Sequence, residues 1–258
     1  MTRKERLEET RAYLKVQKSS TIQALADFLG VSHMTVRRDL STLSSDDSLK
    51  IFHGGVLYQE EGEEQHGDGY SLQLAKTAMH EEKLRIAKKA VSLIESNDII
   101  IIDAGSTGEY IASLLPTDIP LTVICYALNI AAVVSSKKNC TLIVTGGYFH
   151  QSSMVLESNE GLALLKQNRA NKTFITASGV NYELGVTCSN FFERTTKQTA
   201  IKSASTRILV ADSSKFGVIK TGHYADITDF DIIITDNKIK EDQAEPIRKL
   251  GNITLYCV

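Results

Sequence analysis

The chain has 258 residues, with 29 basic and 31 acidic side chains and a formal net charge of −2 at pH 7. Hydrophobic residues make up 42% and charged residues 23%, a globular composition that excludes a wholly disordered chain. At about 100–200 residues per domain, the length fits one large domain or two unequal ones, and the near-neutral total gives no sign of a nucleic-acid partner.

The sequence also argues against a membrane, secreted or metal-binding protein. The longest mainly apolar stretch, residues 121–134, is too short to span a bilayer. The first residues have no apolar core of the kind that a signal peptide needs. The four cysteines are far apart and form no C-x-x-C pair. We therefore expect a cytoplasmic protein with reduced thiols, no membrane partner and no metal site.

The charges divide unevenly along the chain. Residues 1–58 carry nine basic and seven acidic side chains, and residues 59–70 carry five acidic and no basic ones. This predicts a DNA-binding domain at 1–58 (the head), an acidic flexible linker at 59–70 and an effector domain at 71–258 (the body). An acidic surface loop within one domain is the alternative.

The head predicts three helices. Residues 3–18 have the pattern of a surface helix, and residues 22–29 that of a shorter helix, which Gly30 ends. Ser32 can cap a third helix at 33–43, in which one face carries the apolar side chains Val36, Leu40 and Leu43. The opposite face is polar and cationic, as a helix that enters the major groove of DNA requires.

Residues 49–58 predict a wing of two short strands around a glycine pair. Paired arginines alone would favour a solvated helix face. The succession of helix, short helix, glycine turn and capped helix instead favours a helix-turn-helix. The candidate DNA contacts are Ser32, His33, Met34, Thr35, Arg37, Arg38, Ser41 and, in the wing, His53.

The string VSHMTVRRDL at 31–40, followed by HGGV at 53–56, resembles the winged helix-turn-helix of the DeoR family of bacterial transcriptional repressors. The family commonly has an arginine where this chain has Ile51 and a glycine where it has Asp47. The resemblance implies double-stranded operator DNA as a partner. It also implies a homo-oligomer, because several heads must supply the phosphate affinity that one mildly basic head lacks.

The body predicts an α/β fold. Helical patterns cover residues 70–95 and recur near 110–115 and 130–135. Between and after these three patterns lie short apolar runs, which we interpret as strands at 99–102, 121–125, 141–145, 172–177, 207–211, 231–235 and 253–257. Such an alternation indicates a largely parallel sheet, and ligands bind such sheets at the carboxyl ends of the strands.

Polar clusters follow several of these strands. The string DAGSTG at 103–108 would open a helix and form an anion site, although a simple capped turn is the alternative. The string GGYFH at 146–150 fits a ligand contact and a simple glycine turn with a surface histidine equally well. Lys215, in DSSKFG, would offer a cation to a phosphate, with an ordinary surface lysine as the alternative.

The order of these strings resembles the DeoR-family effector domain, whose fold is similar to that of ribose-5-phosphate isomerase. The resemblance implies a phosphorylated sugar as effector, and no cofactor. CYALN at 125–129 and TCSN at 187–190 resemble the sub-type that responds to deoxyribose 5-phosphate. The candidate effector contacts are Asp103, Gly105, Ser106, Thr107, Tyr126, Asn129, Gly146, Gly147, His150, Ser178, Gly179, Glu193 and Lys215.

A sugar-phosphate isomerase is the main alternative function. Proton transfer between sugar carbons needs a carboxylate base, and the isomerases carry acids where this chain has Ser178 and Gly179. Asp103 and Glu193 remain as candidate acids. A sensor that has lost DNA binding is a third hypothesis, against which Arg37 and Arg38 argue. We therefore expect a regulator with no catalytic residues.

Overall fold

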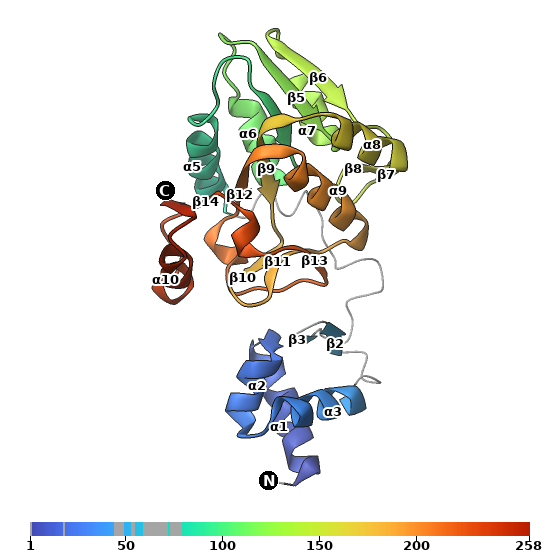
Figure 1. The fold of residues 1–258 in the computed structure, drawn as a ribbon, viewed down its shortest axis with the longest axis vertical. Coiled ribbons are helices and arrows are strands. Elements are labelled where there is room, and N and C mark those ends of the chain that lie inside the picture. The colour runs from blue at the N-terminus through green and yellow to red at the C-terminus, as the bar shows by residue number, and fades with distance from the viewer. Residues whose placement is uncertain (1, 18, 44–48, 53–54, 59–71, 73–78) are drawn as a thin grey trace.

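The structure is a computed structural model that describes residues 2–17, 19–43, 49–52, 55–58, 72 and 79–258 (Figure 1). Two separate clusters of buried apolar side chains form its cores. One lies within residues 14–56 of the head and the other within residues 86–253 of the body. In the described part of the chain, no helix is long and apolar enough to cross a membrane. The described residues also contain no group of three metal-ligand side chains.

The head is a winged helix-turn-helix, as predicted. Its helices are α1 (Arg3–Gln17), α2 (Ile22–Leu29) and α3 (His33–Leu43), and its wing strands are β2 (Leu49–Phe52) and β3 (Gly55–Tyr58). A third strand, β1 (Ser19–Thr21), pairs antiparallel with β3 and was not predicted. This strand ties the link between α1 and α2 to the wing, so helices and wing share one core.

The body is built on a seven-stranded sheet in which every pairing is parallel, which confirms the α/β prediction. Its strand order is β15-β14-β12-β9-β4-β5-β6. The strands are β4 (Ile99–Ile102), β5 (Leu121–Cys125), β6 (Cys140–Val144), β9 (Ala170–Thr176), β12 (Ala204–Val210), β14 (Ile232–Thr235) and β15 (Thr254–Cys257). All seven correspond to the predicted apolar runs, with ends shifted by a few residues.

Helices cover both faces of this sheet (Figure 1). From β4 the chain moves to β5 and β6 in one direction, and from β9 it moves to β12 in the other. Because such crossovers are right-handed, the two halves place their helices on opposite faces. Accordingly, α5 (His80–Val91), α6 (Ser106–Leu114) and α7 (Leu128–Val134) pack side by side, while α8 (Asn159–Gln167) packs on α9 (Phe191–Lys202). The last helix is α10 (Glu241–Lys249).

Small elements follow the carboxyl ends of the sheet strands, and the sequence did not predict them. The strands β7 (Tyr148–His150) and β8 (Val155–Glu157) form an antiparallel pair. A second antiparallel sheet contains β10 (Gly179–Asn181), β11 (Gly185–Cys188) and β13 (Gly222–Ala225). Two 3-10 turns, η2 (Ser213–Lys215) and η3 (Ile227–Asp229), complete this end of the body.

Candidate functional site

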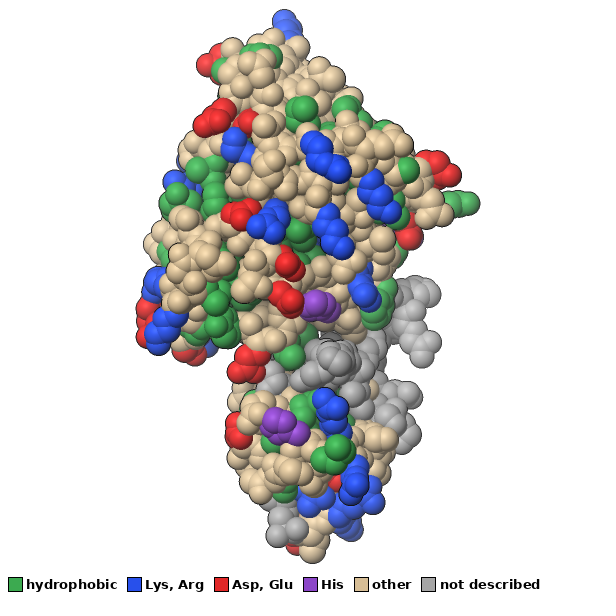
Figure 2. Space-filling model, viewed as in Figure 1, with side chains coloured by type: hydrophobic (Ala, Val, Ile, Leu, Met, Phe, Trp, Pro, Cys, Tyr) green, Lys and Arg blue, Asp and Glu red, His purple; other side chains and the backbone are tan. Residues whose placement is uncertain are grey.

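The third helix of the head has the two faces that the sequence predicted. Val36, Leu40 and Leu43 are at most 4% exposed and belong to the head core. The predicted DNA contacts on the other side are exposed, apart from Thr35, which is half-buried; they are Ser32, His33, Met34, Arg37, Arg38 and Ser41. Figure 2 shows basic side chains on the visible face of the head. His53 lies outside the described residues.

Two contacts fix the position of α3. Asp39 is 2% exposed, and its carboxylate accepts hydrogen bonds from Arg6 Nε at 2.5 Å and Nη2 at 3.2 Å. At the start of the helix, the Ser32 hydroxyl accepts a hydrogen bond from the Thr35 N–H at 3.3 Å, as expected of a cap. An ion pair to α1 therefore orients the helix from its buried side, while its outer face stays open to a partner.

In the body, the candidate site lies at the point in the sheet where successive strands change from being added on one side to being added on the other. Strands β4 and β9 are neighbours, but their following crossovers run in opposite directions. Crevices outside the carboxyl ends of strands at such a switch point are the usual ligand sites of open α/β sheets. Asp103 follows β4, and Thr176 ends β9. These two residues are joined by hydrogen bonds.

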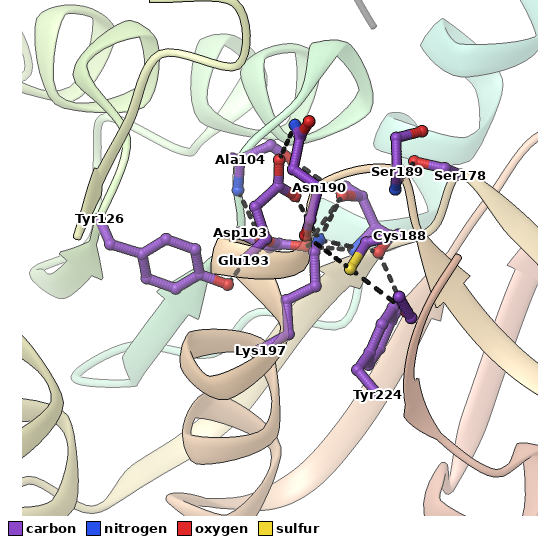
Figure 3. Close-up of polar contacts among 12 residues, drawn as sticks. Asp103, Ala104, Tyr126, Ser178, Cys188, Ser189, Asn190, Glu193, Lys197 and Tyr224 are labelled. Atoms are coloured by element: carbon purple, nitrogen blue, oxygen red, sulfur yellow. Dashed lines mark hydrogen bonds and ion pairs between the residues drawn. The ribbon is translucent and has the colours of Figure 1, made fainter. Parts of the chain in front are cut away.

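Asp103 is the centre of a buried network (Figure 3). Its side chain has no exposed surface and accepts five hydrogen bonds, all from protein groups. One oxygen accepts from Ala104 N and from the Tyr126 hydroxyl at 2.5 Å. The other accepts from the N–H and hydroxyl of Thr176 and from Lys197 Nζ at 2.5 Å. Tyr126 is also fully buried, so both side chains shape the site rather than offering a free group to a ligand.

Lys197 and Glu193 bring α9 into this network. Lys197 is 2% exposed, and its Nζ lies 2.5 Å from an Asp103 oxygen and 3.7 Å from a Glu193 oxygen. Burial opposes the charge on Lys197, but the two carboxylates outweigh it and raise the pKa of the ammonium. Burial raises the pKa of Glu193, although Lys197 and the Asn190 amide, at 2.7 Å, favour its charged form. Sequence reasoning missed Lys197, for which the spacing of four residues from Glu193 was the only signal.

The N-terminus of α6 follows directly on Asp103. Gly105 caps it with φ 103° and no side-chain hydrogen bond, so the first N–H groups of the helix have no capping side chain. Ser106 and Thr107 form its first turn and are 5% and 6% exposed. A Cβ on Gly108 would lie 2.3 Å from the Asp103 carbonyl oxygen, so only glycine allows this turn to pack so closely. A free helix N-terminus with two hydroxyls is a suitable place for a phosphate.

Asn129, on α7, lies against the same turn. Its amide donates to Glu109 Oε2 at 2.8 Å and to the Gly105 carbonyl oxygen at 3.5 Å. Its side-chain oxygen is buried and makes no hydrogen bond among the described residues. A buried acceptor without a donor carries a desolvation penalty that a ligand hydroxyl could remove. Asn129 therefore offers a buried acceptor beside the first turn of α6.

The remaining predicted residues lie in the segments that follow β9 and β6. The Ser178 hydroxyl, after β9, accepts a hydrogen bond from Ser189 N at 3.3 Å. Gly179 has a packing role, because a Cβ there would lie 2.5 Å from the Val218 carbonyl oxygen. Gly146 and Gly147, after β6, both have positive φ. His150 bonds to Glu157 at 2.8 Å and stacks on Phe192 of α9, with ring centroids 3.6 Å apart.

Lys215 lies one strand further along, after β12, and forms a second cationic centre with Lys83 of α5. Lys83 is 2% exposed, with its Nζ 3.9 Å from Asp212. Burial lowers the pKa of Lys83, Asp212 opposes that shift, and the neighbouring charge of Lys215 adds to it. Like charges disfavour each other, so an anion bound near these lysines would relieve that repulsion. Lys83 was not predicted, because in the sequence it looks like one of many charged residues on a surface helix.

Comparison with known proteins assigns both parts of the chain. The model of the DeoR-like helix-turn-helix domain matches residues 6–61. The model of the DeoR C-terminal sensor domain matches residues 78–237. The chain belongs to the DeoR family. This confirms the resemblance seen in the winged helix and in the strings of the body.

Relatives support the same assignment over nearly the whole length. The deoxyribose operon repressor of Escherichia coli K12 is 32% identical over 91% of this chain and 90% of its own. The HTH-type transcriptional regulator GolR of Listeria innocua is 33% identical over 86% of this chain and 85% of its own.

Two solved structures are similar to part of the chain. Ribose 5-phosphate isomerase A of Methanocaldococcus jannaschii has a TM-score of 0.42 at 16% identity, over 54% of this chain and 55% of its own. The eIF2B beta subunit of Chaetomium thermophilum has a TM-score of 0.45 at 17% identity, over 60% of this chain and 48% of its own.

Proposed function

We propose that this DeoR-family protein is a transcriptional repressor of carbohydrate or nucleoside catabolism genes that a phosphorylated sugar releases from its operator. Deoxyribose 5-phosphate is the first candidate effector, because a deoxyribose operon repressor is similar over 91% of the chain. The observation that carries the proposal is the uncapped N-terminus of α6 at the switch point of the sheet, in a chain that also presents an exposed arginine pair on α3. One part suits a phosphate and the other suits DNA.

Thr35, Arg37 and Arg38 would contact bases and phosphates, with Ser32, His33, Met34, Ser41 and His53 as further contacts. The test replaces both arginines with alanine in the full-length protein and measures binding to genomic operator fragments by mobility shift at moderate salt. The matched control replaces Lys4 and Lys15, two exposed basic residues of α1. We expect the arginine variant to lose operator binding and the lysine variant to retain it. Operator binding by the arginine variant would contradict the assignment.

The effector would lie at the carboxyl ends of β4, β5, β9 and β12. Its phosphate would accept hydrogen bonds from the α6 turn of Gly105, Ser106 and Thr107, with Lys215 as a cation. Asn129, Ser178, Glu193, Gly146, Gly147 and His150 would surround the sugar, while Asp103 and Tyr126 hold the loop in place. Such an effector lowers DNA affinity only if it binds the body more tightly when the heads are arranged so that they misfit the operator than when they fit it.

A thermal-shift screen tests this site, because a ligand that binds the native state raises its melting temperature. Phosphorylated pentoses and hexoses are each compared with the unphosphorylated sugar. We expect a rise with a sugar phosphate alone, and Lys215→Ala should weaken its affinity severalfold in calorimetry. Lys240→Ala, which removes an exposed lysine of the body, is the control. An unchanged dissociation constant in Lys215→Ala would remove this lysine from the site.

The proposed organisation is a head at 1–58, an acidic linker at 59–70 and a body at 71–258. Separate cores within residues 14–56 and 86–253 support two folding units. The linker lies outside the described residues. We also propose a homo-oligomer, since one head carries only nine basic against seven acidic side chains. Sedimentation of the full-length protein tests this, and a monomer at the concentration that binds DNA would contradict it.

An isomerase would need a carboxylate that is free to take a proton from carbon. The two Asp103 oxygens already accept five hydrogen bonds, and Glu193 is held by Asn190 and Lys197. The two relatives that match over most of the chain are named as a repressor and a transcriptional regulator. We therefore favour a binding role for the body over catalysis.

A further inference from the structure

Met34 lies at the centre of the side of α3 that faces away from the head core. At about 100° per residue, it projects opposite the buried stripe of Val36, Leu40 and Leu43, with Arg37 and Arg38 on its two flanks. It is 60% exposed and belongs to the first turn of the helix. The N-terminal residues of a recognition helix are the ones that contact base edges.

An apolar side chain at this point has one chemical complement in the major groove. Covering a polar base edge with a thioether removes water from donors and acceptors and returns no hydrogen bond. The 5-methyl group of thymine is the apolar feature that the groove offers. Methionine is unbranched and flexible, so it can follow such a group without a fixed rotamer. The adjacent Ser32 and Thr35 hydroxyls lie 3.0 Å apart and bond to each other, so these two polar groups are engaged at the start of the helix.

We infer that Met34 reads a thymine through its 5-methyl group. The inference rests on the proposed DNA-binding function and adds the identity of one base in each half-site. Arg37 and Arg38 flank the thioether and contact neighbouring bases and phosphates, while Met34 adds discrimination for thymine. An isolated exposed apolar residue needs no such role in general. The position of Met34 on the helix, and not its exposure alone, carries the assignment.

The experiment uses the full-length protein to select a high-affinity duplex from random-sequence DNA. Fluorescence anisotropy then compares this duplex with versions in which each thymine in turn is replaced by uracil, which removes only the methyl group. We expect uracil at one symmetric position to weaken wild-type binding about fourfold, the fold-change for burying one methylene-sized group. Met34→Ala should bind the thymine duplex more weakly and bind the thymine and uracil duplexes equally.

Val16→Ala is the matched control, because Val16 is 77% exposed but lies on α1. It should retain the wild-type preference for thymine over uracil. The inference is overturned if the wild type is indifferent to uracil at every position, or if Met34→Ala keeps the wild-type preference. A selection that enriches no sequence at all contradicts the DNA-binding function itself.

Discussion

Replacing Lys197 with methionine tests the buried network at the switch point. Removing one partner of a buried ion pair costs about 3–5 kcal/mol, because the other charge stays buried without compensation. Asp103 would keep four of its five donors, so we expect a loss near the lower end, about 3 kcal/mol. For a unit of this size, such a loss lowers the melting temperature by about 6–12 °C.

Differential scanning calorimetry of the full-length protein measures this shift. The control is Lys202→Met, which removes an exposed lysine from the last turn of the same helix and should change the melting temperature by no more than about 2 °C. The double variant Asp103→Asn/Lys197→Met should lose less than the sum of its single variants, because residue 103 then carries no charge that needs the lysine. If Lys197→Met melts within 2 °C of the control, the buried pair does not stabilise the body.

Two further predictions concern the same end of the sheet. The folded protein holds the Glu193 proton to a higher pH than the unfolded chain does, so this group's contribution to stability falls as the pH rises above its ordinary pKa of 4.5. Glu193→Gln should therefore gain stability relative to the wild type as the pH is raised from 4.5, and a pH-independent difference in melting temperature would contradict the raised pKa. Gly108→Ala should displace the α6 turn, because its Cβ would lie 2.3 Å from the Asp103 carbonyl oxygen. Calorimetry should then show weaker binding of the sugar phosphate, and unchanged affinity would remove that turn from the site.

The strands of the sheet could be predicted from the sequence because they are continuous apolar runs. Ile100, Ile101 and Ile102 are fully buried and Ile99 is half-buried, as expected of a strand in a parallel sheet that is covered on both faces. The recognition helix was readable because Val36, Leu40 and Leu43 repeat at helical spacing. The strand β1 was not readable, since Ser19–Thr21 is polar and extended only through its pairing with β3. Local pattern therefore predicted elements with their own hydrophobic period and missed those that tertiary pairing imposes.

The centre of the body site shows the same limit. The sequence correctly placed Asp103 at the end of a strand, next to a helix N-terminus. It could not show that five protein donors occupy this carboxylate, because the donors come from residues as far away as Lys197 in the chain. Lys197 and Glu193 look like an ordinary surface pair one helical turn apart. Their burial depends on the packing of α9 against the sheet, which has no signature in local sequence.

The most direct test of the proposed regulation is release of DNA by a sugar phosphate. Full-length protein is bound to a fluorescent operator duplex, and anisotropy is followed as deoxyribose 5-phosphate is added, with deoxyribose as the control. The proposal predicts release by deoxyribose 5-phosphate and none by the unphosphorylated sugar, since the α6 turn and Lys215 recognise the phosphate. Persistence of the complex with deoxyribose 5-phosphate and every other sugar phosphate tested, or equal release by deoxyribose, would contradict it.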